Sequence, residues 1–274
     1  MSSPINTLLE MANLPDGTQI QVLNGYEASF VIDEIFHGNA YPINLREGPP
    51  SPVIIDIGAN IGIFVRYALN QCPEARIFAF EPAPQVFELL SKNTSAYRSQ
   101  VIVERCGISD APGEAEFTYY PNYSLLSGFK AIPEEDALLL RSGISTQLSS
   151  NPRLAGRVTE RHVCALAEGK LDGSVTIECP LNTLSYFISL HKIERVDFLK
   201  IDAERCELPI LRGIQEEHWS LIQCVCMELH ESSAVDSTAQ DVRNILEEQG
   251  FHITLQFSSS AHPRTILLHA TRAS

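Results

Sequence analysis

A short apolar run that ends at a glycine constrains the fold more than any other part of this sequence. Residues 53–57, Val-Ile-Ile-Asp-Ile, are hydrophobic apart from Asp56, as is typical of a strand buried on both faces of a parallel sheet. Gly58 follows directly, and apolar residues then recur at helical spacing from Ile61 to Leu69. Parallel strands need a long crossover connection, so this pattern predicts the first β-α unit of a doubly wound α/β sheet.

The same alternation continues along the chain. It predicts further strands at 76–80, 101–103, 116–120, 176–179, 196–201, 221–229, 251–257 and 265–270, and helices at 86–90, 182–190, 209–213 and 239–249. Only a short polar turn separates the last two strands, so they should pair antiparallel.

Between Ser124 and Gly173 the strand signals fade, and leucine-rich helical pieces alternate with Ser, Pro and Gly. This stretch predicts an insertion or lid within a core domain of residues 53–274, while residues 1–52 form an N-terminal extension.

The composition excludes several classes of protein. Twenty basic and 34 acidic residues give a net charge of −14, which argues against a nucleic-acid groove as the main surface. With 44% hydrophobic and 20% charged residues the chain should fold. The start lacks a basic and apolar leader and no apolar run approaches about 18 residues, so we expect no membrane association and a cytoplasmic location. Seven scattered cysteines indicate neither a disulfide framework nor a zinc ribbon.

The loop Asp56-Ile57-Gly58-Ala59-Asn60-Ile61-Gly62 stands where ligands bind in such sheets. A dinucleotide fingerprint read from Gly58 would need glycine at Asn60 and Ile63, so a ligand without a pyrophosphate is favoured. Glu81 ends the next strand, 23 residues after Gly58, where a carboxylate can accept both ribose hydroxyls of an adenosyl group. The alternative is that the glycines only ease packing and Glu81 caps a helix.

Three groups of residues carry a family resemblance. The loop at 56–62, the sequence Phe80-Glu81-Pro82, and Leu199-Lys-Ile-Asp202-Ala-Glu204-Arg-Cys-Glu207 resemble the FkbM family of S-adenosylmethionine-dependent O-methyltransferases. Flanking matches at Asn24-Gly-Tyr-Glu27, Glu34-Ile-Phe36 and Met227-Glu228-Leu-His230 resemble the branch that acts in polyketide and nonribosomal peptide biosynthesis.

The resemblance implies a class I methyltransferase fold, with a Rossmann-like seven-stranded sheet and an antiparallel last strand. It implies S-adenosylmethionine as the cofactor, with a site formed by Tyr41, Asp56, Gly58, Ala59, Asn60, Gly62, Glu81, Pro82, Gly107 and Asp202. Gly107 would lie against the adenine, and Tyr41 would cover the cofactor unless it only fills a packing position. One departure stands out: many members have Glu-Gly where this chain has Glu204-Arg205, which leaves the substrate class open.

The candidate catalytic residues follow from strand alternation. Glu228 and His230 share one face of the strand that begins at Leu221, and Asp202 ends the strand beside the cofactor strand. An alcohol needs a base before it can attack a methyl group, and a His beside carboxylates suits that role. We therefore expect His230 to be the general base. His230 as an exposed strand end, and a divalent metal held by the three side chains, are the alternatives.

Substrate contacts are expected in and beside the lid. Tyr120 and Ser127 leave a strand in a stretch of aromatic and hydroxyl side chains. Between residues 141 and 170 of the lid, five basic residues oppose only Glu160 and Glu168, a local charge of +3: Arg141, Arg153, Arg157, Arg161 and Lys170. Arg153 and Arg157 could then contact the substrate or, together with Arg161, dock an acidic acyl carrier protein. A solvated helix face is the alternative.

These observations lead to one main functional hypothesis: methylation of a hydroxyl on a polyketide or nonribosomal peptide intermediate, free or bound to a carrier protein. Methylation of a free small molecule or sugar is the second hypothesis, and a non-catalytic cofactor-binding module is the third.

Overall fold

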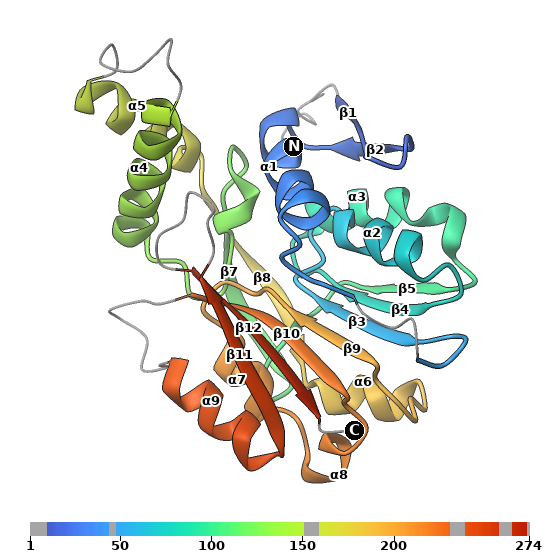
Figure 1. Ribbon diagram of the computed structural model, residues 1–274. Helices are drawn as coiled ribbons and strands as arrows, with labels where there is room; N and C mark the ends of the chain where they lie inside the picture. The colour runs from blue at the N-terminus through green and yellow to red at the C-terminus, as the bar shows by residue number, and fades with distance from the viewer. Residues whose placement is uncertain (1–9, 44–47, 151–158, 231–238, 258–264, 273–274) are drawn as a thin grey trace.

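The computed structural model describes residues 10–43, 48–150, 159–230, 239–257 and 265–272. Its centre is a seven-stranded sheet (Figure 1). The strands lie in the order β11 (Phe251–Phe257), β12 (Thr265–Arg272), β10 (Cys224–His230), β9 (Phe198–Ile201), β3 (Val53–Ile57), β4 (Arg76–Phe80) and β5 (Val101–Glu104). Strands β10, β9, β3, β4 and β5 are parallel, and β12 runs antiparallel to both of its neighbours, as the sequence predicts.

The sheet register brings the chemically important strand ends together. Ile57 at the end of β3 pairs with Phe80 on β4 and with Ile201 on β9. Since parallel strands end at the same edge, Gly58, Glu81 and Asp202 follow these three residues side by side.

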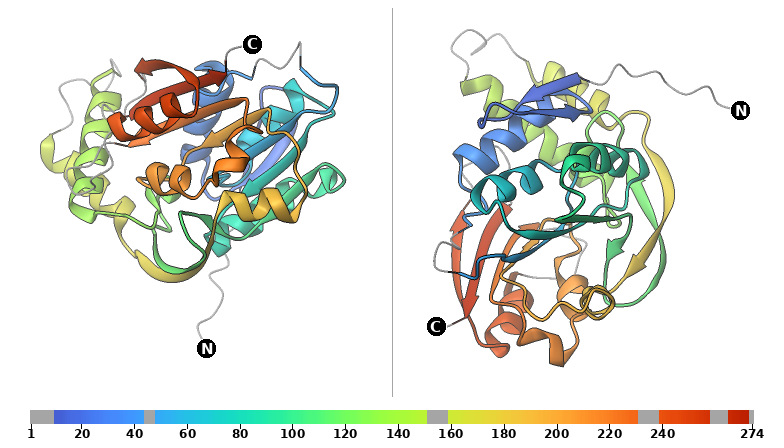
Figure 2. Two further views of the ribbon diagram at one scale, coloured as in Figure 1. Left: turned by 90° about the horizontal axis from the view of Figure 1, so that it is seen from below. Right: turned by 90° about the vertical axis from the view of Figure 1, so that its right-hand side faces the viewer.

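Helices cover both faces of the sheet, as three views show (Figures 1 and 2). One hydrophobic core joins the sheet to α2 (Ile63–Gln71) and α3 (Pro84–Asn93). A second core joins the other face to α6 (Leu184–Leu190), α7 (Glu207–Arg212), α8 (Glu216–Trp219) and α9 (Ala239–Glu248). The molecule is therefore a three-layer α/β sandwich. Among the described residues, no helix is long and apolar enough to cross a membrane.

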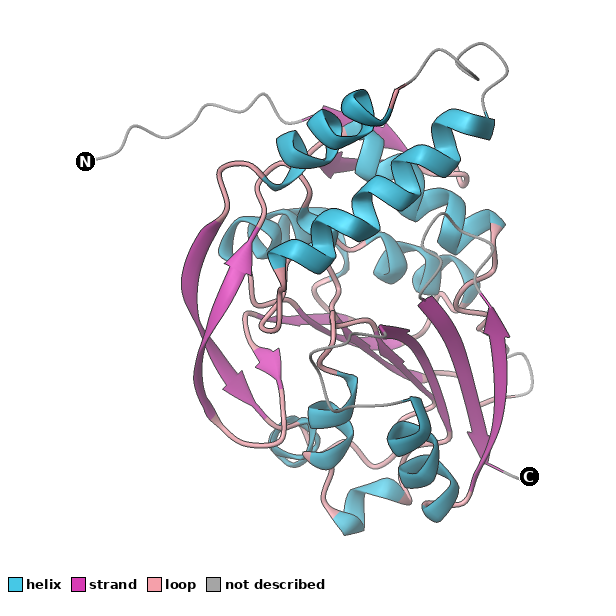
Figure 3. Ribbon diagram, turned by 90° about the vertical axis from the view of Figure 1, so that its left-hand side faces the viewer, coloured by secondary structure: helices cyan, strands magenta, loops and turns pink. Residues whose placement is uncertain are grey.

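A second sheet carries the lid. Strands β6 (Gly107–Ile108), β8 (Val175–Asn182) and β7 (Gly113–Tyr119) form a separate three-stranded sheet that the sequence did not distinguish from the main one. Tyr119 at the end of β7 pairs with Val175 at the start of β8, so the intervening chain projects from a hairpin. That chain forms η3 (Ser124–Leu126) and two packed helices, α4 (Pro133–Ser150) and α5 (Glu160–Leu171) (Figure 3).

The N-terminal extension contains β1 (Glu10–Asn13), β2 (Gln19–Val22), α1 (Gly25–Ile32) and the π-helix η1 (Asp33–His37). Asn24 caps α1 by accepting the Glu27 amide at 2.8 Å. The buried Glu27 carboxylate in turn accepts the amide and the hydroxyl of Ser124 at 2.9 and 2.6 Å. Through Glu27 and Ser124 the N-terminal extension thereby contacts the lid directly.

Candidate active site

The loop after β3 is shaped by three residues with left-handed backbones: Gly58 (φ +77°), Asn60 (φ +47°) and Gly62 (φ +92°). Glycine is required at the first of them, because an added Cβ on Gly58 would lie 1.8 Å from the carbonyl oxygen of Asp202. The loop that carries Asp202 therefore passes directly against Gly58, which also lines the cavity described below.

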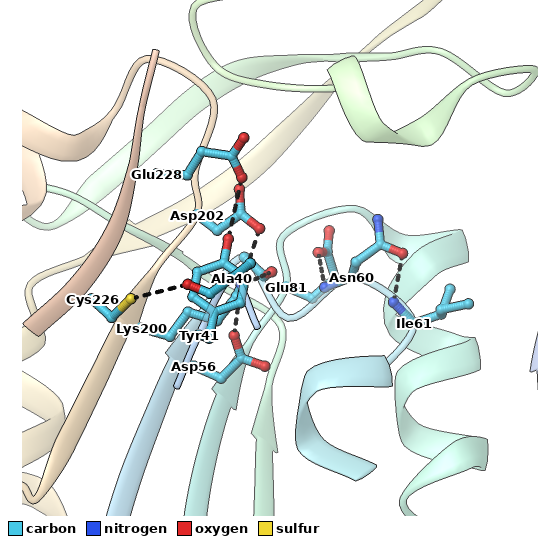
Figure 4. A network of polar contacts seen from close by, with 11 residues as sticks. Ala40, Tyr41, Asp56, Asn60, Ile61, Glu81, Lys200, Asp202, Cys226 and Glu228 are labelled. Atoms are coloured by element: carbon cyan, nitrogen blue, oxygen red, sulfur yellow. Dashed lines mark hydrogen bonds and ion pairs between the residues drawn. The ribbon is translucent and has the colours of Figure 1, made fainter. Parts of the chain in front are cut away.

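Glu81 holds that loop from the next strand. One carboxylate oxygen accepts the Asn60 amide at 3.0 Å (Figure 4). The other accepts the Ala83 amide at 2.9 Å. Burial raises the pKa of Glu81 to about 7, although both amide donors oppose the shift. Glu81 therefore does cap its own chain and hold the loop, as the simpler alternative proposed, and it also lines the cavity described below.

Lys200 is the centre of the polar network and was not among the predicted site residues. Its ammonium lies 3.0 Å from Asp56 Oδ1 and 3.2 Å from Asp202 Oδ2, and donates to the Gly58 carbonyl at 3.2 Å. Burial would lower the pKa of Lys200, but Asp202 and Asp56 outweigh it and keep the pKa raised. A lysine within the apolar strand Phe-Leu-Lys-Ile was the signal that could have identified it.

Asp56 does not contact the cavity. Its side chain is fully buried beneath the loop, and burial raises its pKa while Lys200 opposes the shift. In this structure Asp56 faces Lys200 rather than the cavity, and its expected role in cofactor binding stays a prediction. Gly62 also lies outside the cavity lining and serves as the N-cap of α2.

Tyr41 closes the network from the N-terminal extension. Its hydroxyl donates to Glu228 Oε2 at 3.2 Å, and Lys200 Nζ lies 5.0 Å from its ring centre (Figure 4). Burial, with Asp202 and Glu228 nearby, raises the pKa of Tyr41 well above its ordinary value, so the phenol stays protonated and donates. Strand β10 pairs with β9 at Met227 and Ile201, which brings Glu228 beside Asp202.

The polar side chains described above, apart from Asp56, line one continuous cavity. Its sheet end is formed by Gly58, Ala59, Asn60, Glu81, Pro82, Gly107, Asp202 and Glu228, with Tyr41 between α1 and the sheet. Its lid end is formed by residues 124–129, Leu139 of α4, Glu204 and Arg205. Phe30, Val31, Glu34 and Ile35 of the N-terminal extension complete the wall. Asp202, just after β9, and Glu228, near the end of β10, lie close to each other (Figure 4). Glu204, two residues after Asp202, packs closely against Gly128 of the lid.

Of two predicted substrate residues, one lines the cavity and the other does not. Ser127 lines the lid end, and its hydroxyl accepts the Tyr120 amide at 3.0 Å. Tyr120 does not line the cavity: its ring is buried in the lid core and its hydroxyl donates to Asp136 at 3.0 Å. An aromatic at a strand end can face either way, and here the adjacent helix α4 determined the direction.

Some predicted residues lie outside the described part. The backbone of His230 ends β10, two residues beyond Glu228, but its side chain is not among those described. Arg153 and Arg157 also fall outside the described residues.

Two of the other lid cations have partners within the chain. Arg141 pairs with Glu168 at 3.6 Å. Lys170 lies 4.1 and 4.2 Å from the ring centres of Tyr26 and Tyr123. Arg161 is exposed on α5.

Residues 56–253 match the family model described as the methyltransferase FkbM domain. The chain is 32% identical over 252 residues to 31-O-demethyl-FK506 methyltransferase FkbM of Streptomyces tacrolimicus, covering 92% of each protein. It is 32% identical over 250 residues to AMB antimetabolite synthetase AmbE of Pseudomonas aeruginosa, covering 89% of this chain and 12% of AmbE. The crystal structure of methyltransferase FkbM from Methylobacillus flagellatus superposes with a TM-score of 0.50 at 13% identity, over 90% of this chain and 55% of that one.

Proposed function

Because the chain belongs to the FkbM methyltransferase family and is an S-adenosylmethionine-dependent methyltransferase, we propose that it methylates a hydroxyl of a polyketide or nonribosomal peptide intermediate. The observation that carries this proposal is that one cavity is lined by Asp202 and Glu228, by the loop after β3 and by residues 124–129 of the lid. A methyl donor and an alcohol must be held in contact for the transfer, and we place their meeting point, the junction, at these two carboxylates.

The residues of the sheet end fit the cofactor. Glu81 is a buried carboxylate at the cavity wall, and we assign it to the ribose hydroxyls, whose donated hydrogen bonds would favour its ionised form. We assign the Gly58–Asn60 loop to the amino-acid moiety and Gly107 to the adenine. Carboxylates near the junction suit a cationic ligand. S-adenosylmethionine supplies a methyl group bonded to a positively charged sulfur.

The chain's own residues then have distinct roles. Lys200 fixes the orientation of Asp202 and neutralises Asp56, so that Asp202 can position the acceptor. We propose that His230 takes the proton of the acceptor hydroxyl on its imidazole, and that Glu228, held by Tyr41, stabilises the imidazolium. This assignment follows from the register of β10, in which His230 follows Glu228 on the same strand face.

We further propose that the acceptor is presented by a carrier protein. Its support is the similarity to a synthetase, AmbE, of which this chain matches only 12%. We also propose that residues 1–52 act as an extension of the site, since Tyr41 and Glu27 connect that segment to Glu228 and to the lid.

The test is transfer of a labelled methyl group from S-adenosylmethionine to a panel of hydroxyacyl groups, each offered on a carrier protein and as a free hydroxy compound. Transfer to carrier-bound members supports the proposal. Transfer to a free small molecule or sugar alone would replace it with the second hypothesis.

A further inference from the structure

Arg205 holds a backbone conformation that its side chain disfavours. Its φ is +60°, in the left-handed region where glycine is the residue without steric cost. A residue in such a strained backbone conformation persists only where its surroundings hold it. The contacts of the Arg205 side chain are therefore expected to hold it there.

The Arg205 side chain is buried against the lid, with 2% of its surface exposed. Its Nη2 lies 2.7 Å from Oδ1 of Asp136 in α4, and its Nη1 donates to the Lys130 carbonyl at 3.1 Å. Asp136 is fully buried, and its other oxygen accepts the Tyr120 hydroxyl at 3.0 Å and the Ile132 amide at 3.1 Å. We call the pair Arg205–Asp136 the latch.

The latch joins two walls of the cavity. Arg205 belongs to the loop after β9 that also carries Asp202 and Glu204. Asp136 lies three residues before Leu139, which lines the lid end. A Cβ added at Gly128 would lie 3.1 Å from the Cβ of Glu204, so this loop also packs tightly against the lid. A shift of the loop is therefore transmitted directly to α4.

We propose that Arg205 is a positioning residue that couples occupancy of the sheet end to the closure of α4 over the lid end. A ligand that contacts Asp202 fixes the loop after β9, the loop fixes the guanidinium, and the guanidinium fixes Asp136. The proposal rests on the family activity alone and not on the identity of the acceptor.

Hydrogen exchange of residues 133–146 tests the coupling, with S-adenosylhomocysteine as the ligand. Removing only one partner would leave an uncompensated buried charge, so the main variant carries R205G and D136N together. In the wild type we expect saturating S-adenosylhomocysteine to slow exchange in α4 about fivefold or more. In the double variant this slowing should disappear. The separate variant R205K, with Asp136 intact, should keep part of the slowing.

Lys192 supplies a matched control. It is exposed, and its φ of +50° is also left-handed, so K192G relieves similar backbone strain without touching the lid. It should retain the wild-type slowing. A purely structural role for Arg205 predicts faster exchange in the double variant with an unchanged response to the ligand. That outcome, or an unresponsive α4 in the wild type, overturns the proposal.

Discussion

The two ends of the cavity are built from different kinds of structure. The sheet end is formed by the loops that follow β3, β4 and β9, whose positions are fixed by the ladder of a buried parallel sheet. The lid end is formed by a hairpin insertion outside that sheet, held by buried carboxylates: Glu27 on Ser124 and Asp136 on Arg205. The sheet end is thus positioned by the main sheet, whereas the lid end has a small hydrophobic core of its own and is joined to the rest of the protein by these polar contacts.

The largest expected effect tests the junction between the two ends. Replacing His230 with Ala should lower turnover by about 10²–10⁴-fold, because the acceptor hydroxyl would lose its general base. Affinity for S-adenosylhomocysteine, measured by calorimetry, should stay within about twofold of the wild type. Unchanged turnover would remove His230 from the mechanism and leave Asp202 or Glu228 as the remaining candidates.

Removing the charge of Lys200 at the sheet end should lower the stability of the folded protein. K200M leaves Asp56 buried without its counter-charge, so we expect a loss of about 3–5 kcal/mol in the free energy of unfolding, measured with urea. The double variant K200M/D56N should recover part of this loss. Lys92 is exposed on α3, and K92M provides the matched control. Equal effects of K200M and K92M would contradict the network as described.

The raised pKa of Glu81 predicts that the stability of the ligand-free protein depends on pH. Its pKa is raised from 4.5 to about 7 in the folded state, so the folded protein binds the proton more tightly than the unfolded chain. Stability should therefore be fully present below about pH 4.5 and fall as the pH rises toward 7, by about 3 kcal/mol from this group.

E81Q should abolish that part of the pH dependence, as measured by urea unfolding between pH 4.5 and 8. Glu88 is exposed on α3, so E88Q should keep the wild-type profile. Parallel profiles for E81Q and the wild type would contradict the raised pKa of Glu81.

The smallest effect concerns the three arginines that we expect to dock a carrier protein. Reversing Arg153, Arg157 and Arg161 to Glu should slow methylation of a carrier-tethered acceptor about tenfold, through weaker steering of an acidic partner. A short thioester carrying the same acyl group should react at the wild-type rate. Equal losses on both acceptors would show that these side chains act within the lid and not on a carrier.

Much of the sheet end could be predicted because its signals are local. A buried strand followed by Gly58, and another followed by Glu81, place both residues at one edge of any parallel sheet. The family, its fold and its cofactor are confirmed. The sequence did not show that Gly58 accommodates Asp202, since the two residues lie on loops far apart in the chain.

The lid end could not be predicted to the same depth. An alternating pattern placed Tyr120 on a strand end but could not tell whether its ring faces the cavity or the lid core. The partnership of Arg205 with Asp136 spans 69 residues and has no periodicity that would reveal it.

The sequence by itself determined the strands of the main sheet, the ligand edge of that sheet and the family, because hydrophobic period and turn residues act over a few positions. Tertiary structure alone decided which buried charges meet. Asp56 pairs with Lys200 and does not line the cavity. Tyr120 donates to Asp136, and Arg205 pairs with Asp136 in the lid. A buried charge is stable only beside a partner, and such partners are brought together by the fold rather than by neighbouring sequence.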